Sequence, residues 1–295
     1  KVVITATGNN ASDLYVNGIR VGAGPGTGTS NTLVGSGAMN SNTTGSNNTS
    51  VGKYSMLLNT LGSNNVALGF ASLCLNTTGG RNTAIGAGAS GFNTTGSCNV
   101  SLGNSALLRN TTGSCNIAIG YASLIENTTG SRNIATGYNS LASSSTAWDN
   151  TAIGAYALYS NTSGSQNAAI GLNALYSNTT GENNISIGKE SLVSNTTGNK
   201  NTALGFEAAC DNVTGSGTVY IGYQARGVDN VVDAVSIGCG SYVGNFYDVA
   251  IGKLATTAGG VSIGRQAKSG SNSVAIGSMA GRINVSGFEN IFIGA

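Results

Sequence analysis

The sequence predicts an all-β protein, a parallel β-solenoid of about 17 coils with mostly 17 residues in each coil. Glycine recurs every 17 residues from Gly35 to Gly222, and the residue before it is aliphatic at each step except Thr136. Charged residues make up only 8% and there are 46 glycines, a composition that disfavours helices and ordinary globular domains. The 40% of hydrophobic residues is enough for a core if these residues are regularly placed.

Residues 1–30 lack the repeat and come before the first coil. Residues 1–6 (KVVITA) are typical of a strand. The pair Asn17-Gly18 separates two short apolar runs, residues 14–16 and 19–21, as in a two-residue hairpin turn. We expect residues 1–30 to form a strand and hairpin that act as an adaptor or as a cap over the first open coil edge.

The regular coils span residues 31–222 and have the consensus N-T-A-I-G-x-x-A-L-x-x-N-T-T-G-S-x. Positions two to four alternate as in a short strand, with bulky apolar side chains on one face and small ones on the other. Positions eight and nine, such as Ala106-Leu107, form a second apolar pair, so we expect a second short strand. Asn and Gly of the N-T-T-G run tolerate the left-handed conformation that a tight corner needs.

Equivalent residues of successive coils should lie above one another, about 4.8 Å apart. Two columns of asparagine follow, one at the first position of the coil and one at the twelfth. Stacked asparagine amides can form hydrogen bonds along the axis of such a stack. We therefore interpret both columns as structural and not as ligand-binding.

Residues 223–295 continue the repeat with shorter coils. After Gly222 the glycine steps are 16, 14, 12, 13 and 17 residues, ending at Gly294. The cross-section of the solenoid should therefore change near residues 223–238. We expect the natural chain to continue beyond both ends of the sequence.

The residue types exclude several kinds of chemistry. The chain has no histidine, which removes Ser-His-Asp and Cys-His nucleophile systems. Asp229 and Asp233 are four residues apart, and we interpret them as a solvated turn and not as a glycosidase pair. We predict no catalytic, cofactor-binding or metal-binding residues and no enzyme activity. The net charge of +2 without a basic run predicts no nucleic-acid partner, and no apolar stretch is long enough for membrane insertion.

Two further columns carry side chains of individual character. Cys98 and Cys115 share one column, and we favour free thiols, with a disulfide between them as the alternative. Aromatic residues recur just after the glycine, and packing between coils or subunits is favoured over a carbohydrate-stacking stripe. The aromatic residues are Phe70, Tyr121, Tyr138 and Phe206.

The short copies at residues 260–264 (GVSIG) and 273–277 (SVAIG) resemble the head repeats of trimeric autotransporter adhesins, the YadA-like heads. The longer N-T-A-I-G…N-T-T-G-S form, preceded by residues 14–24 (LYVNGIRVGAG), looks like repeats of bacteriophage tail-fibre and other virion proteins. This resemblance implies a left-handed β-roll that assembles as a homotrimer.

These observations predict a structural and adhesive fibre segment of a virion, in the tail or capsid, that spaces or presents a receptor-binding region. It would lie outside cells on the virion surface, with itself, other fibre or virion proteins and a cell-surface receptor or glycan as partners. The alternative is the head of a bacterial trimeric surface adhesin. An ice-binding solenoid, motivated by stacked threonines such as Thr94-Thr95, ranks below both.

Overall fold

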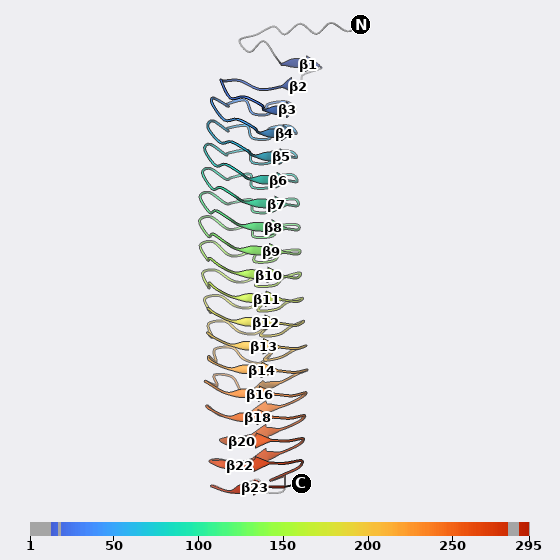
Figure 1. The fold of residues 1–295 in the computed structure, drawn as a ribbon, viewed down its shortest axis with the longest axis vertical. Coiled ribbons are helices and arrows are strands. Elements are labelled where there is room, and N and C mark those ends of the chain that lie inside the picture. The colour runs from blue at the N-terminus through green and yellow to red at the C-terminus, as the bar shows by residue number, and fades with distance from the viewer. Residues whose placement is uncertain (1–12, 17–18, 283–288, 295) are drawn as a thin grey trace. The chain divides into compact units, whose positions relative to one another are not determined.

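The computed structural model describes residues 13–16, 19–282 and 289–294, which contain strands and turns but no helix. The chain divides into two units, residues 1–149 and 150–295. Within each unit, short parallel strands lie one above another with turns between them (Figure 1). Each unit is therefore a parallel β-solenoid, as the repeat predicts.

The first unit contains a parallel stack of seven three-residue strands, each one coil after the last. Residues 17 apart are direct partners, as where Thr83 pairs with Val100 and Ile85 pairs with Leu102. The predicted register is thus confirmed. The strands are β3 (Thr32–Val34), β4 (Thr49–Val51), β5 (Val66–Leu68), β6 (Thr83–Ile85), β7 (Val100–Leu102), β8 (Ile117–Ile119) and β9 (Ile134–Thr136).

A hairpin precedes this stack. Strands β1 (Leu14–Val16) and β2 (Ile19–Gly22) pair in antiparallel fashion, as predicted. Strand β2 also pairs with β3, which occupies the edge of the first coil. Asp13 accepts a hydrogen bond from the Arg20 guanidinium at 2.6 Å and others from the following lead-in backbone. The turn residues 17–18 and the strand predicted for residues 1–6 lie outside the described residues.

The second unit contains two parallel sheets of described strands. The larger consists of β10 (Thr151–Ile153), β11 (Ala168–Ile170), β12 (Ile185–Ile187), β13 (Thr202–Leu204), β14 (Val219–Ile221), β16 (Val235–Ile237), β18 (Val249–Ile251), β20 (Gly260–Ile263), β22 (Ser273–Ile276) and β23 (Ile291–Ile293). The smaller consists of β15 (Arg226–Gly227), β17 (Tyr242–Val243), β19 (Thr256–Thr257) and β21 (Lys268–Ser269). The second strand of a coil therefore starts only where the coils become short.

The prediction of two strands in each regular coil is wrong for residues 31–222. Positions eight and nine lie in a turn, and the leucine at position nine has a left-handed backbone, with φ 53° at Leu107 and 52° at Leu124. A residue with that conformation cannot continue a ladder of extended strands. The apolar pair nevertheless faces inward, since Ala106 and Leu107 are fully buried.

The solenoid interior is narrow and is filled by small residues and one leucine column. The central residue of the strand, at position three of the coil, is Ala or Ser in most coils and is buried, as at Ala84 and Ala118. The bulky residues on either side of it point away from the interior. Larger central residues are also fully buried at Leu33 in β3 and at Tyr220, an aromatic ring in β14. Gly227 leaves room for it, because a Cβ there would lie 3.0 Å from the Tyr220 hydroxyl oxygen.

Two asparagine columns tie the coils together in different ways. At position twelve the amide Nδ2 donates to the Oδ1 one coil earlier, as Asn93 does to Asn76 at 2.8 Å. At position one it is the backbone N–H that donates, as Asn82 does to the Asn65 Oδ1 at 2.9 Å. The Asn82 Nδ2 donates instead to the Gly96 carbonyl at 2.9 Å. The predicted amide ladder is thus confirmed at position twelve, and a mixed ladder runs at position one.

The N-T-T-G corner does not use the left-handed conformation expected for its Asn and Gly. Asn93 and Gly96 have no left-handed φ, and the left-handed residue is Cys98, two positions after the glycine, at φ 60°. Glycine is required at this corner for space. A Cβ on Gly96 would lie 2.3 Å from the Gly113 carbonyl oxygen and 2.5 Å from the Asn93 Oδ1.

Candidate interaction surfaces

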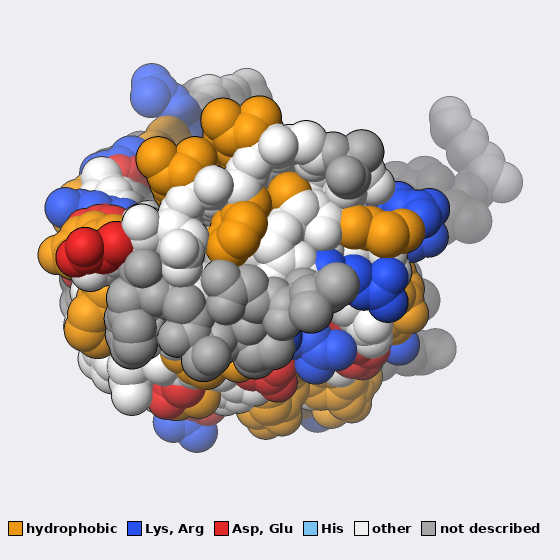
Figure 2. Space-filling view, turned by 90° about the horizontal axis from the view of Figure 1, so that it is seen from below, with side chains coloured by type: hydrophobic (Ala, Val, Ile, Leu, Met, Phe, Trp, Pro, Cys, Tyr) orange, Lys and Arg blue, Asp and Glu red, His pale blue; other side chains and the backbone are white. Residues whose placement is uncertain are grey.

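The outward face of the strands is an exposed apolar stripe in each unit. The residues on either side of the buried central one are aliphatic or threonine, and many remain about 40% exposed, such as Leu102 at 43% and Leu204 at 45%. Neither the stack β3–β9 of the first unit nor the larger sheet of the second unit contains Asp, Glu, Lys or Arg in its described strands. Figure 2 shows hydrophobic side chains at the surface on the end of the second unit. An exposed apolar stripe of this kind is a candidate interaction surface.

The aromatic residues after the glycine pack on one another. Tyr121 and Tyr138 are stacked, with ring centroids 5.3 Å apart and planes 11° apart. Phe206 stacks in the same way on Tyr223, at 5.4 Å and 8°. Phe70 meets Tyr54 edge to face at 6.2 Å. In the stacked pairs, one face of each ring is turned toward its neighbour, which fits packing between coils better than a stripe for sugar rings.

A further stacked pair was not foreseen from the sequence. Tyr159 and Tyr176 lie with their ring centroids 5.2 Å apart, and Tyr156 meets both rings edge to face. The signal that could have revealed the pair is their spacing of 17 residues at position ten of the coil.

Two acidic residues, Asp229 and Asp248, accept hydrogen bonds from the backbone of turns. Asp229 accepts hydrogen bonds from the backbone N–H groups of Val213 at 2.8 Å and Thr214 at 3.1 Å. Asp248, which is buried, accepts from Gly259 and Gly260. Carboxylates that accept backbone N–H groups act as structural caps. In the described ranges, no group of three or more His, Cys, Asp or Glu side chains could hold a metal ion.

All five cysteines are free thiols in the structure. Cys98 and Cys115 are exposed, as is Cys239. Burial raises the pKa of the Cys74 thiol and also that of Cys210. A raised thiol pKa lowers the thiolate fraction, so these two side chains are poor nucleophiles.

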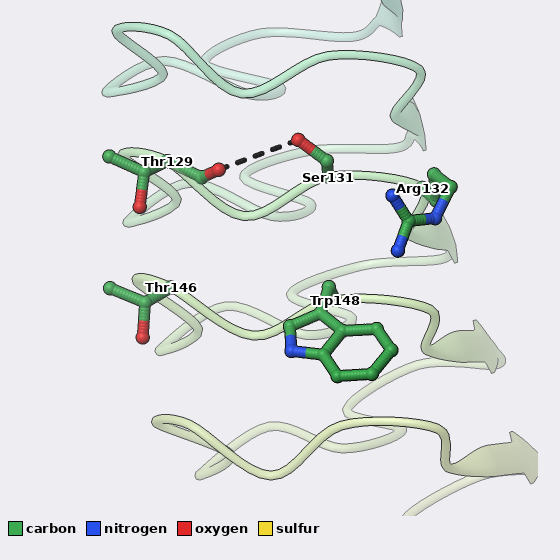
Figure 3. Close-up of a pocket in the computed structure, with 5 residues that line it drawn as sticks. All are labelled: Thr129, Ser131, Arg132, Thr146 and Trp148. Carbon is green, nitrogen blue, oxygen red and sulfur yellow. Dashed lines mark hydrogen bonds between the residues drawn. The ribbon is translucent and has the colours of Figure 1, made fainter.

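A hollow of about 360 Å³ opens in the first unit, at the coil formed by residues 133–149. Its walls come from two successive coils (Figure 3). Arg132 donates from Nε to the Asp149 Oδ1 at 2.6 Å and from Nη2 to the Oδ2 at 3.1 Å. This pairing lowers the pKa of the Asp149 carboxyl and raises that of Arg132. The lining residues are Thr129, Ser131, Arg132, Thr146 and Trp148.

The Arg132 guanidinium also lies over the indole of Trp148, 5.7 Å from the ring centroid. Sequence reasoning missed this hollow, although Trp148 is the one tryptophan of the chain. The departure of its coil from the consensus is the signal that could have found it. Instead of N-T-T-G-S, residues 144–148 read S-S-T-A-W.

No protein-family model matches the chain. No curated protein is significantly similar to it. Across the described part of the chain, no helix is long and apolar enough to cross a membrane.

Proposed function

We propose that this chain is a structural and adhesive segment of a virion fibre, in the tail or capsid, that spaces or presents a receptor-binding region at the virion surface. It acts as a left-handed β-roll homotrimer and carries out no enzymatic reaction. Its partners are two further copies of itself, other fibre or virion proteins, and a receptor or glycan on a cell. The observation that supports this proposal most is the uncharged apolar stripe along the strands.

The period of the stripe favours a second copy of the chain as its occupant. Aliphatic side chains such as Ile170 and Ile187 recur at each coil step, in register with the strand pairing. A partner that covers the stripe continuously must present apolar side chains at the same axial spacing. Another copy of this chain has that spacing by construction, and closed symmetric assembly of identical chains is common among oligomers.

The trimer is tested by sedimentation equilibrium and native mass spectrometry. We expect a mass three times the chain mass of 29.2 kDa. The double variant Ile170→Lys/Ile187→Lys places two charges on the stripe and should dissociate the assembly. The matched control is Thr180→Lys, an exposed site between the same two strands. A stable monomer of the unmodified chain would contradict the proposed architecture.

The place of the fibre is tested by immunogold labelling with antibodies against the purified chain. Label on virus particles from the source supports the virion fibre. Label on bacterial cells supports the alternative, the head of a trimeric surface adhesin, which the short coils β18 to β22 favour because their steps fall to 12 and 13 residues.

The ice-binding alternative has less support from the threonines. Thr94 Oγ1 donates to the Thr111 carbonyl at 2.9 Å, and Thr111 donates in turn to Thr128. These hydroxyls are used within the stack, so only the second threonine of each pair remains exposed, as at Thr95. Measurement of thermal hysteresis tests the idea, and no activity is expected.

A further inference from the structure

The coil of residues 133–149 departs from the repeat at several columns together. Between residues 42 and 215, all the remaining coils have asparagine at position twelve and glycine at position fifteen. This coil has Ser144 and Ala147 at those positions. Position four is Thr136 instead of an aliphatic residue, and position sixteen is Trp148.

The changes at Ser144 and Ala147 belong together sterically. In the regular coils a Cβ at position fifteen would meet the asparagine Oδ1 three residues earlier, as on Gly130, 2.3 Å from the Asn127 Oδ1. Serine is shorter than asparagine and leaves that space for the methyl group of Ala147. The exchange interrupts the amide ladder, and the buried Asn127 Oδ1 and Ser144 Oγ are without a hydrogen-bond partner. A coil that gives up hydrogen bonds of the stack is a candidate for a role other than stacking.

We propose that the hollow beside this coil is a saccharide-binding subsite, in which Trp148 is the stacking platform for one neutral pyranose ring. The inference rests on the proposed function, because it names the chemical class of cell-surface ligand that the fibre would bind. The indole is 43% exposed and the hollow lies at the small end of the range for ligand pockets, which is about 300–1,000 Å³.

The polar groups around Trp148 suit hydroxyl groups and not a charged ligand. Asp149 takes two of the five N–H groups of Arg132 and neutralises its charge, which leaves donors for sugar hydroxyls without strong attraction for an anion. Thr129, Ser131 and Thr146 add hydroxyls around the hollow, and Ser131 donates to the Thr129 carbonyl at 3.4 Å (Figure 3). The apolar C–H face of a pyranose would pack on the indole.

The subsite differs from the aromatic pairs elsewhere in the first unit. Tyr121 and Tyr138 are stacked ring on ring, so each covers a face of the other. At Trp148 the group over one side of the ring is the Arg132 guanidinium, which is itself a donor for sugar hydroxyls. A single shallow subsite of this kind binds weakly, and three copies in a trimer would strengthen attachment to a surface polysaccharide by avidity.

The single tryptophan makes the test direct, because the intrinsic indole fluorescence of the whole chain comes from Trp148. The assembled protein is titrated with the methyl glycosides of glucose, galactose, mannose, N-acetylglucosamine and rhamnose. We expect at least one of them to cause a saturable change in indole emission and a saturation-transfer NMR signal. Acrylamide should quench the indole before the sugar is added and less so afterwards.

Variants of Trp148 and Arg132 test whether these two side chains bind the saccharide. Trp148→Ser restores the consensus residue, so it should fold, and we expect NMR binding to weaken at least about tenfold. Arg132→Gln should weaken binding as well. The controls are Tyr121→Ser and Arg109→Gln, the latter an exposed arginine paired with Glu126 in the same unit, and neither should change binding.

Three results would overturn the subsite: no saturable signal with any glycoside, unchanged binding in Trp148→Ser, or an indole that acrylamide cannot reach in the assembled protein. The last result would show that another chain covers Trp148. Sedimentation of the same sample reports on the trimer independently, and immunogold labelling reports on the fibre. Failure of the subsite is therefore distinguishable from failure of the proposed function.

Discussion

The side-chain amide of Asn110 donates a hydrogen bond to the Oδ1 of Asn93, one coil earlier, across 2.6 Å. The same Nδ2 donates to the Gly113 carbonyl at 2.9 Å within its own coil. From Asn59 to Asn127, each asparagine of this column therefore closes its own corner and joins its coil to the preceding one. The column is part of the buried interior, where loss of one partner leaves others unsatisfied.

Replacement of Asn93 by alanine should lower the free energy of unfolding by about 2–4 kcal/mol, because the Asn76 Oδ1 and the Gly96 carbonyl both lose a donor. Urea unfolding followed by circular dichroism measures the change. Thr95→Ala removes an exposed side chain from the same corner and should stay within about 0.5 kcal/mol of the unmodified chain. Equal effects of the two variants would argue against the ladder as a source of stability.

Repair of the interrupted ladder should stabilise the chain. The double variant Ser144→Asn/Ala147→Gly restores the consensus corner, and we expect a gain of about 1–3 kcal/mol because the Asn127 Oδ1 acquires a donor. Ser144→Asn alone should gain less, since its Oδ1 would meet the Ala147 methyl group. A double-mutant cycle measures the coupling of the two sites. Additive effects would show that the steric link is absent.

Burial of Tyr220 should make the protein less stable in alkali. Loss of solvation is the main cause that raises the pKa of this phenol above its ordinary value of about 10. The folded chain therefore holds the phenol proton more tightly than the unfolded chain. This contribution is fully present below pH ~10 and is lost as the pH rises further, by at most about 1.4 kcal/mol per pH unit.

The alkaline loss is checked by the unfolding midpoint as a function of pH for the unmodified chain and for Tyr220→Phe. The phenylalanine variant keeps the ring in β14 but has no proton to lose, so its profile should fall less steeply above pH ~10. Parallel profiles would mean that another group causes the alkaline loss.

The five thiols should divide into two classes on alkylation with iodoacetamide at neutral pH. Cys98, Cys115 and Cys239 are exposed and should react first. Cys74 and Cys210 should react slowly because burial raises their pKa. Peptide mass spectrometry with and without reductant measures the order. A Cys98–Cys115 disulfide would appear as two thiols that react only after reduction.

Much of the fold could be predicted from the sequence because a strict repeat leaves few choices. The 17-residue step fixes which residues become neighbours, so Thr83 and Val100 are paired as expected. The missing second strand could not be predicted from hydrophobicity. Leu107 is apolar and buried, but its position in a strand or a turn depends on a backbone angle that the apolar pattern does not report.

The candidate subsite was harder to predict than the fold. A consensus of the coils keeps recurring residues such as Asn93 and Gly96. It omits Trp148, which occurs in one coil alone. The relation between Ser144 and Ala147 becomes visible only when the space around Gly130 is known, since the constraint on both is steric. In a repeat protein, the coil that fits the consensus least is the first place to look for binding.

The position-one column has a consequence for how such a chain changes length. The backbone N–H of Asn82 donates to the Asn65 Oδ1, just as the backbone N–H of Asn65 donates to the Asn48 Oδ1. Excision of residues 65–81 would bring Asn82 to Asn48 with identical partners, and duplication of that segment would do the same. Recombination between such repeats can therefore lengthen or shorten the gene by whole coils while this column of hydrogen bonds is kept.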